Sequence, residues 1–122
     1  MAKATGVGGV FLRAQDQAAL AKWYAEVLGL PVEQGDYAVL RSSGGETLTW
    51  AAFPADTDYF GSKGQAVMVN YRVDDLDAML ERLREAGAAV DDHIEEHEYG
   101  RFGWAVDPEG NRLELWQPPP GH

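Results

Sequence analysis

The chain has 122 residues, of which 45% are hydrophobic, and it carries a formal net charge of −10. This length suffices for one domain with a buried core, and the acidic surface would repel nucleic acid. The absence of cysteine excludes disulfides, thiolate metal sites and a cysteine nucleophile. No apolar run approaches the ~20 residues that a membrane span requires, and the first residues lack the apolar core of a signal peptide. We therefore expect a single domain, residues 1–122, in the cytoplasm, without nucleic-acid or membrane partners.

The first half of the chain predicts a strand, a helix and three further strands. Residues 7–14 alternate in character and predict the first strand. Asp16 is suited to cap a helix over residues 17–28, and Gly29 is suited to end it. The apolar residues at helical spacing are Leu20, Trp23, Tyr24, Val27 and Leu28. Short strands are expected at 30–33, 37–41 and 47–53, with a hairpin turn at 42–45.

The second half repeats this pattern. Residues 66–73 predict a strand, and Asp74 is the expected N-cap of a helix at about 75–86 that ends before Gly87. Two strands, connected by the turn at 107–111, follow this helix. We therefore predict an α+β fold of two βαβββ modules, whose paired, curved mixed sheets form a cup for a ligand. The modules are expected at about 5–54 and 66–118, joined by a loop at 55–65.

The last expected strand, residues 112–116, has two different faces. Leu113 and Leu115 point to one side, whereas Glu114 and Trp116 point to the other. A carboxylate beside a tryptophan in the middle of a strand is an ordinary surface acid if that face is solvated. If the face lines a cavity, Glu114 is the best single candidate for chemistry in the chain.

Polar and aromatic residues share the sheet face that the two helices leave uncovered. A core would not bury unpaired charges, because their desolvation is costly, so we interpret this face as the lining of a small-molecule site. The candidate ligand-binding residues from this argument are Phe11, Arg13, Met68, Asn70, Arg72 and Trp116, with Trp104 as a further ring whose strand register is open. For Arg72, a second interpretation is a structural ion pair with Glu114 across the sheet.

Several phrases of the sequence resemble one known family. Residues 16–30 contain Trp23-Tyr24 and Val27-Leu28-Gly29-Leu30, residues 72–76 read Arg-Val-Asp-Asp-Leu, and residues 107–115 read Asp-Pro-Glu-Gly-Asn-Arg-Leu-Glu-Leu. In this order they resemble the vicinal oxygen chelate superfamily, which includes glyoxalase I, bleomycin-resistance proteins and extradiol dioxygenases. The resemblance covers nearly the whole chain. It implies a homodimer, because two chains of this family commonly complete one cup.

The metal ligands of this superfamily are largely missing from the chain. Metal-dependent members carry ligands, usually His and Glu, at four strand positions, and the resemblance maps these onto Gly9, Thr49, Met68 and Glu114. Only Glu114 suits the divalent ions of these enzymes, because glycine has no side chain and a thioether is a poor ligand for them. We therefore expect no metal cofactor, and neither glyoxalase I nor extradiol dioxygenase activity. Thr49 becomes a further candidate ligand-binding residue.

The resemblance leaves two functions open. Metal-free relatives, typified by bleomycin resistance, imply that the chain binds a small organic ligand in an aromatic cleft and sequesters it. The alternative is a lyase, isomerase or dioxygenase-like enzyme that uses Glu114 as a base or as a residual metal ligand. In that enzyme Arg13, Asn70 and Arg72 would hold an anionic substrate.

Two further segments have more than one interpretation. Tyr59 and Phe60, in the expected loop between the modules, either anchor that loop on the core or cover a ligand or a partner subunit. His93-Ile94-Glu95-Glu96-His97 matches the letters of a zinc-protease motif, but that motif requires a helix. We expect these five residues to form a solvated acidic segment instead.

Overall fold

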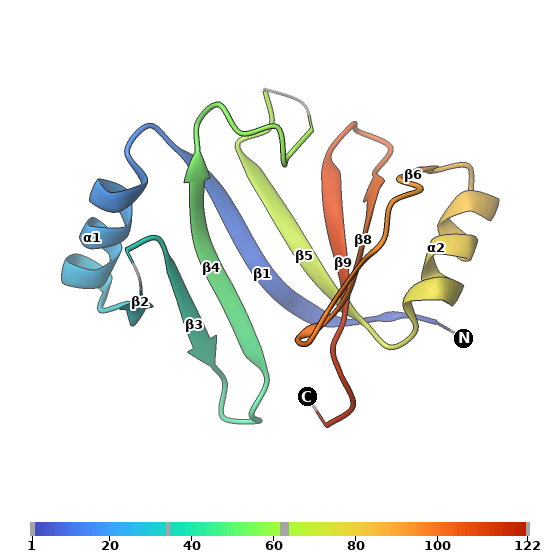
Figure 1. Cartoon of the computed structure of the whole chain (residues 1–122), viewed down its shortest axis with the longest axis horizontal. Coiled ribbons are helices and arrows are strands. Elements are labelled where there is room, and N and C mark those ends of the chain that lie inside the picture. The colour runs from blue at the N-terminus through green and yellow to red at the C-terminus, as the bar shows by residue number, and fades with distance from the viewer. Residues whose placement is uncertain (1, 34, 62–63, 122) are drawn as a thin grey trace.

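The computed structural model describes residues 2–33, 35–61 and 64–121, which form one mixed sheet of nine strands with two helices on its outer side (Figure 1). The strands are β1 (Ala4–Ala14), β2 (Val32–Glu33), β3 (Tyr37–Arg41), β4 (Thr47–Pro54), β5 (Val67–Val73), β6 (Ala89–Val90), β7 (Glu95–His97), β8 (Gly100–Val106) and β9 (Arg112–Gln117). The helices are α1 (Gln17–Leu28) and α2 (Leu76–Glu85). The sheet curves into an open U, with α1 outside one wall and α2 outside the other.

The two βαβββ units join through their first strands. The strand order is β2-β3-β4-β1-β5-β9-β8-β6, and β7 pairs with β8. Strand β1 runs antiparallel to β5, while β1 is parallel to β4 and β5 is parallel to β9. The predicted α+β class with two βαβββ units is therefore confirmed, and the second unit contains one additional short strand, β7. The paired, curved sheets that we expected are joined into one continuous sheet, because β1 and β5 pair and leave neither strand with an open edge.

Helix α1 has the boundaries that its sequence predicts. The Asp16 carboxylate accepts a hydrogen bond from the Ala19 N–H at 3.0 Å, which satisfies one of the donors at the start of the helix. Gly29 ends the helix in the left-handed region, with φ of 73°. Tyr24 packs on Trp50 of β4, with ring centroids 4.7 Å apart, so α1 covers the outer face of the first unit.

Three apolar residues of α1 lie on its outer side. Trp23, Val27 and Leu28 are 52%, 60% and 59% exposed, whereas Ala21 is fully buried and Leu20 packs beside it. Helical spacing predicts a helix but not the width of the face that is covered. Here the helix contacts the sheet through a stripe narrower than its apolar surface.

Helix α2 begins one residue later than its sequence predicts. Its N-cap is Asp75, whose carboxylate accepts from the Ala78 N–H at 3.1 Å. The expected cap, Asp74, instead accepts a hydrogen bond from the Lys3 N–H at 3.0 Å. Two adjacent aspartates can each cap a helix, and the contact with the start of the chain decides between them.

Apolar packing lies on both faces of the sheet. One buried cluster lies under α1 and another under α2. The third lies on the inner face, beside the loop that joins the two units, and consists of Phe11, Phe60, Met68 and Trp104. The inner face is therefore partly core and partly available for a site.

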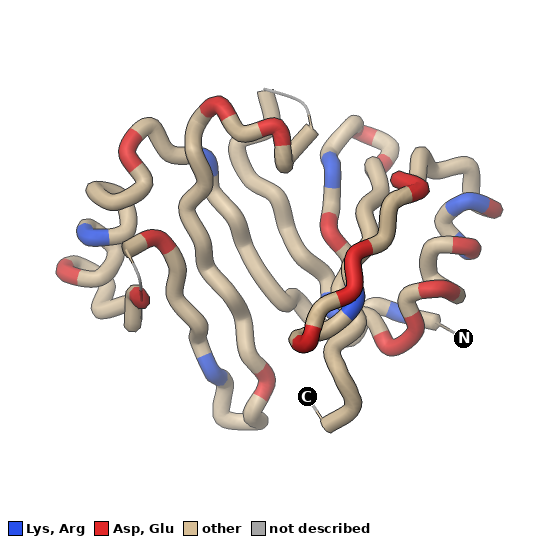
Figure 2. Tube along the Cα trace, in the orientation of Figure 1, with Lys and Arg blue, Asp and Glu red and all other residues tan. Residues whose placement is uncertain are grey.

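The acidic residues lie mainly away from the inner face of the sheet. Figure 2 shows them along α2, along the segment that leads into β8 and at the turns between strands. Strand β4 carries no charged residue, and β1 and β5 carry one arginine each. In the described part of the chain, neither helix has the length and apolar character needed to cross a membrane.

Candidate functional site

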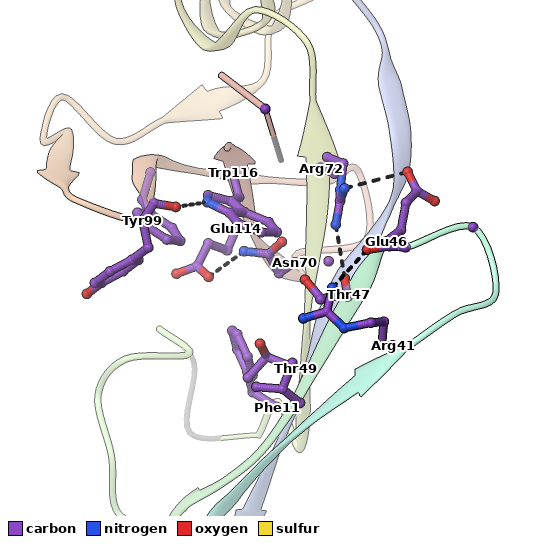
Figure 3. Close-up of a pocket in the computed structure, with 16 residues that line it drawn as sticks. Phe11, Arg41, Glu46, Thr47, Thr49, Asn70, Arg72, Tyr99, Glu114 and Trp116 are labelled. Atoms are coloured by element: carbon purple, nitrogen blue, oxygen red, sulfur yellow. Dashed lines mark hydrogen bonds and ion pairs between the residues drawn. The ribbon is translucent and has the colours of Figure 1, made fainter. Parts of the chain in front are cut away.

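A cavity of about 870 Å³ opens on the inner face of the sheet (Figure 3). Its walls come from β1, β3, β4, β5, β8 and β9, and from the turn between β3 and β4. The predicted site residues that line it are Phe11, Thr49, Asn70, Arg72, Glu114 and Trp116. The structure thus brings six of the nine predicted residues together around one space, and places the other three elsewhere.

Glu114 lies at the wall of this cavity with only 2% of its surface exposed. On β9 it is opposite Asn70 of β5 and Trp104 of β8. Asn70 Nδ2 donates to Glu114 Oε1 at 2.6 Å, and Trp104 Nε1 donates to Oε2 at 3.0 Å. The Tyr59 hydroxyl donates a third hydrogen bond, also to Oε2. Fixed donors therefore occupy three of the roughly four lone-pair sites of the carboxylate.

Burial dominates the electrostatics of this cluster. Desolvation raises the pKa of Glu114 above its ordinary value, and the hydrogen bonds from Tyr59, Asn70 and Trp104 oppose this rise only in part. Burial also raises the pKa of Tyr59 far above its ordinary value, and the neighbouring Glu114 carboxylate raises it further. Tyr59 therefore remains a neutral hydrogen-bond donor throughout the physiological pH range.

The raised pKa of Glu114 predicts an unusual pH dependence of stability. A raised carboxyl pKa in the folded state stabilises the fold fully below the ordinary pKa of about 4.3, and this stabilisation is lost as the pH rises to the folded-state pKa. We expect the unfolding free energy of the wild type, relative to Glu114→Gln, to fall as the pH rises above that value. Chemical denaturation at a series of pH values measures this difference.

Asp107 provides a control of opposite sign. Hydrogen bonds from the backbone and side chain of Asn111 hold the pKa of Asp107 below its ordinary value. The stability that this carboxylate contributes is present above the ordinary pKa and is lost as the pH falls. The unfolding free energy of the wild type, relative to Asp107→Asn, should therefore fall as the pH falls. If the difference in unfolding free energy changed with pH in the same direction for Glu114→Gln and Asp107→Asn, this would contradict a raised pKa of Glu114.

The loop between the two units carries Tyr59 and Phe60 inward. Phe60 is fully buried, and the Tyr59 ring stacks on Phe53 with centroids 5.3 Å apart and planes 8° apart. Arg112 Nε donates to the Tyr59 carbonyl at 3.1 Å, which holds the loop against β9. The loop is thus anchored on the core, and it also delivers the Tyr59 hydroxyl to Glu114. No pattern in the sequence indicates this second role, because Tyr59 and Glu114 are far apart in the chain.

Arg13 does not reach the cavity, contrary to our expectation. Its Nε donates to the Gln65 carbonyl at 2.6 Å, and its Nη1 donates to the carbonyls of Ala55 and Thr57 at 2.8 and 2.7 Å. Its guanidinium lies 5.0 Å from the centroid of the Phe60 ring. Arg13 is near the end of β1, where the neighbouring loop supplies these acceptors. It therefore fixes the loop that carries Tyr59.

Met68 and Trp104 lie behind the cavity wall rather than on its surface. Both are buried, at 0% and 1% exposure, in the cluster with Phe11 and Phe60. Strand alternation correctly predicts the inner face for Met68, but it carries no information about depth below the surface. Trp104 acts on the site indirectly, through its hydrogen bond to Glu114.

Arg72 lines the cavity but does not pair with Glu114. Its Nη1 forms an ion pair with Glu46 at 3.5 Å, and its Nη2 donates to the Thr47 carbonyl at 3.0 Å. The register explains this, because Arg72 is opposite Trp116 on β9 and Glu114 is opposite Asn70. The structural pair that we considered between Arg72 and Glu114 is therefore absent from the described residues.

Several lining residues lie outside the predicted set. Arg41 and Glu46 come from the β3–β4 hairpin, Phe102 comes from β8, and Tyr99 lies in the turn before β8. The sequence predicts only a turn at this hairpin, and it leaves two interpretations open for Tyr99 and for the rings of β8, as core or as cavity lining. Trp104 pairs with Glu114 and Phe102 pairs with Trp116, which settles the register of β8.

Gly8 makes space for the close packing of this wall. A Cβ atom at this position would lie 2.5 Å from Asn70 Oδ1 and 2.8 Å from the Trp116 ring. Glycine inside a strand often marks such a close approach of another group. The adjacent glycines at 8 and 9 were therefore a usable signal for the tight packing around Asn70.

The four positions that would hold a metal do not fit one. A side chain at Gly9 would lie 3.0 Å from the Phe11 ring and 3.1 Å from the Thr49 carbonyl, so the ring occupies its space. Met68 is buried in the core, and the Glu114 oxygens face three hydrogen-bond donors. No group of three or more acidic, histidine or cysteine side chains in the described ranges could hold a metal ion.

Comparison with known families identifies the family of this chain. A family model described as a glyoxalase-like domain matches residues 9–116, which include all six predicted residues that line the cavity. The chain belongs to this glyoxalase-like family. The predicted membership of the vicinal oxygen chelate superfamily is therefore confirmed. A search of curated proteins found no match.

Solved structures share the fold of this glyoxalase-like domain. Methylmalonyl-CoA epimerase from Mycobacterium tuberculosis is 24% identical, with a TM-score of 0.66 over 96% of this chain and 90% of that one. The Streptomyces coelicolor epimerase, in complex with 2-nitronate-propionyl-CoA, is 19% identical, with a TM-score of 0.69 over 95% and 99%. A glyoxalase/bleomycin resistance protein/dioxygenase superfamily member from Vibrio splendidus is 18% identical, with a TM-score of 0.62 over 91% and 97%.

The histidine segment of this glyoxalase-like domain is not a zinc-protease helix. Residues Glu95–His97 form β7, and His93 lies in the segment before it. The Nε2 atoms of His93 and His97 lie 3.2 and 3.0 Å from the two oxygens of Glu95. Glu96 points elsewhere and pairs with Arg101 at 3.3 Å. Because the motif requires both histidines on one helical turn, the extended backbone excludes that interpretation.

Proposed function

We propose that this glyoxalase-like domain binds a small organic ligand in a metal-free aromatic cleft. The observation that supports this most directly is the cavity of about 870 Å³, which is within the size range of small-molecule sites. Phe11, Phe102 and Trp116 give it apolar walls, while Thr49 and Asn70 supply polar groups among them. Rings with a few fixed polar groups suit the binding of a flat molecule.

The chemistry of Glu114 supports a site without a metal. A metal-binding carboxylate must turn a lone pair toward the ion, but here Tyr59, Asn70 and Trp104 already donate to both oxygens. The other three mapped positions offer no comparable ligand. Glu114 in this proposal organises the wall of the cleft and holds the Tyr59 loop in place.

Calorimetry on protein dialysed against EDTA tests the proposal. The probes are naphthalene derivatives that carry a carboxylate, an amide or an ammonium group. We expect at least one to bind, and Trp116→Ala to weaken that binding roughly tenfold through the lost ring contact. Trp23→Ala is the matched control, because Trp23 lies on the outer side of α1. Binding that needs an added divalent metal, or that responds equally to both variants, would contradict the proposal.

Sequestration of the resistance type is the finer form of this proposal. A sequestering protein gains its effect from affinity and returns its ligand unchanged. After prolonged incubation with stoichiometric protein, a bound probe should therefore be recovered intact by liquid chromatography. Recovery of a converted product would favour the enzyme described next.

A proton-transfer enzyme is the second candidate, and the raised pKa of Glu114 at the cavity wall favours it. Glu114 as a base would take a proton from a carbon acid in the cleft, leaving a carbanion on the ligand. Its three hydrogen bonds leave only one lone-pair site for that proton, so we rank binding first. Deuterium uptake from D₂O into a bound ligand, abolished in Glu114→Gln, would reverse this ranking.

A homodimer in the cytoplasm completes the proposal. The exposed apolar residues Trp23, Val27 and Leu28 of α1 are the kind of surface that association covers. Light scattering coupled to size-exclusion chromatography should give twice the chain mass of 13.4 kDa. A mass equal to that of one chain at micromolar concentration would contradict the dimer without affecting the cleft.

A further inference from the structure

Two arginines, Arg41 and Arg72, line the cavity next to the β3–β4 hairpin, which carries Glu46 (Figure 3). Arg41 Nη1 donates to the Gly45 carbonyl at 3.2 Å, and Arg72 Nη2 donates to the Thr47 carbonyl at 3.0 Å. These two carbonyls belong to the residues that flank Glu46 in the β3–β4 hairpin. The backbone of the hairpin thus accepts a hydrogen bond from each guanidinium group, and its Glu46 carboxylate pairs with Arg72.

Arg72 is a buried cation with a weakly held partner. It is 7% exposed, whereas the side chain of Glu46, 3.5 Å away, is 61% exposed. The hydrogen bond to Thr47 and this ion pair use two of the five N–H groups of the guanidinium. An exposed carboxylate at this distance contributes little stabilisation and is readily displaced. Arg72 is therefore a buried cation that can exchange the Glu46 carboxylate for an anionic group of a ligand in the cavity.

The neighbouring ring of Trp116 indicates which kind of molecule carries this anionic group. The Arg72 guanidinium lies 5.1 Å from the centroid of the Trp116 ring, and Trp116 stacks on Phe102 with planes 12° apart. Trp116, Phe102 and Tyr99 all line the cavity. A ligand that contacts both the rings and Arg72 must carry its anionic group close to a flat apolar body.

We propose that the ligand of this cleft is a flat aromatic carboxylate, with its ring against Trp116 and its carboxylate held by Arg72 and Arg41. This inference rests on the proposed function, since it names the ligand class of the same cleft. A cationic ligand would face two guanidinium groups. The second carboxylate of the wall, Glu114, could not compensate, because three donors already occupy its oxygens. The net charge of −10 resides mainly outside the cleft (Figure 2).

Three matched probes test the ligand class: 2-naphthoate, 2-naphthamide and 2-naphthylmethylammonium. Their apolar bodies are the same, so differences in affinity report the charged group. By calorimetry at low salt and near-neutral pH, we expect 2-naphthoate to bind at least tenfold more tightly than the other two, because a charged hydrogen bond to Arg72 is stronger than a neutral one. Added salt should selectively weaken the binding of 2-naphthoate.

Three substitutions test the residues. Arg72→Gln should weaken the binding of 2-naphthoate roughly 10- to 100-fold and leave the binding of 2-naphthamide nearly unchanged. Arg41→Gln, at an exposed position, should weaken it roughly two- to fivefold. Glu46→Gln should strengthen it by a similar factor, because the competing carboxylate is gone. A gain of affinity cannot come from damage to the fold, so this variant keeps the test valid if Arg72→Gln unfolds. Arg84→Gln on α2 is the control and should change nothing.

The outcomes separate the inference from the proposed function. If the amide or the ammonium binds as tightly as the carboxylate, or if Glu46→Gln weakens 2-naphthoate, the ligand class is wrong while the cleft still binds a small molecule. If none of the three probes binds the wild type, both the inference and the proposed function are overturned.

Discussion

Replacing Glu114 with alanine is expected to lower the free energy of unfolding by about 3 kcal/mol, because it leaves three buried donors without their acceptor. Tyr59, Asn70 and Trp104 all donate to this one carboxylate, and Glu114 itself is 2% exposed. Water from the adjoining cavity can satisfy some of the stranded donors, which keeps the loss below the sum of three separate penalties. Because Tyr59 is carried by the inter-module loop, the same change should also loosen that loop.

Denaturation in urea, with Glu109→Ala as the control, measures this effect. Glu109 is an exposed acid in the turn that precedes β9, so its replacement should change stability by no more than about 0.5 kcal/mol. Limited proteolysis should cut Glu114→Ala faster between residues 55 and 61. If the two variants were equally stable, Glu114 would be an ordinary wall residue rather than the anchor of the cluster.

Replacing Gly100 with alanine is expected to destabilise the domain by about 3 kcal/mol and to weaken binding in the cleft. Gly100 has a φ of 131°, a backbone conformation that residues with a side chain rarely adopt. A Cβ atom here would lie 2.4 Å from Trp116 Nε1 and 2.6 Å from the Gln117 carbonyl. The first contact would displace the indole that donates to the Tyr99 carbonyl at 2.7 Å. The second would open the β8–β9 pairing.

Gly110→Ala separates the two causes. Gly110 also has positive φ, of 88°, but a Cβ atom there would have no neighbour within 4 Å. This control should cost only about 1 kcal/mol, the price of the backbone conformation alone. It should leave the affinity for 2-naphthoate unchanged, whereas Gly100→Ala should reduce it. Equal losses of stability in the two variants would show that the Trp116 wall tolerates an extra methyl group.

Local signals in the sequence predict most of the elements of this fold. The boundaries of α1 follow from Asp16 and Gly29, and those of β3 from an apolar run between turns, because both depend on nearest neighbours in the chain. The face on which Glu114 and Trp116 lie follows from the two-residue period of a strand. These signals suffice to place six predicted residues around the cavity.

The depth of a side chain below the surface, and its contacts with residues far along the chain, could not be predicted in this way. Alternation places Met68 on the inner face but does not show that Phe60 covers it. The acceptors of Arg13 belong to the inter-module loop, whose path has no sequence period. The pairing of Arg72 with Glu46 depends on how the β3–β4 hairpin approaches β5 in space. Such contacts depend on the curvature of the assembled sheet.

Titration of the ¹⁵N-labelled, EDTA-dialysed domain with 2-naphthoate tests the central claim most directly, because amide and indole shifts report where the ligand lies. The account predicts saturable shifts at Gly8, Thr49 and the Asn70 side-chain amide, and at the Trp116 indole N–H, with little change at Trp23 on α1. Shifts confined to the outer surface or to β7, or shifts that appear only after a divalent metal is added, would contradict a metal-free cleft on the inner face of the sheet.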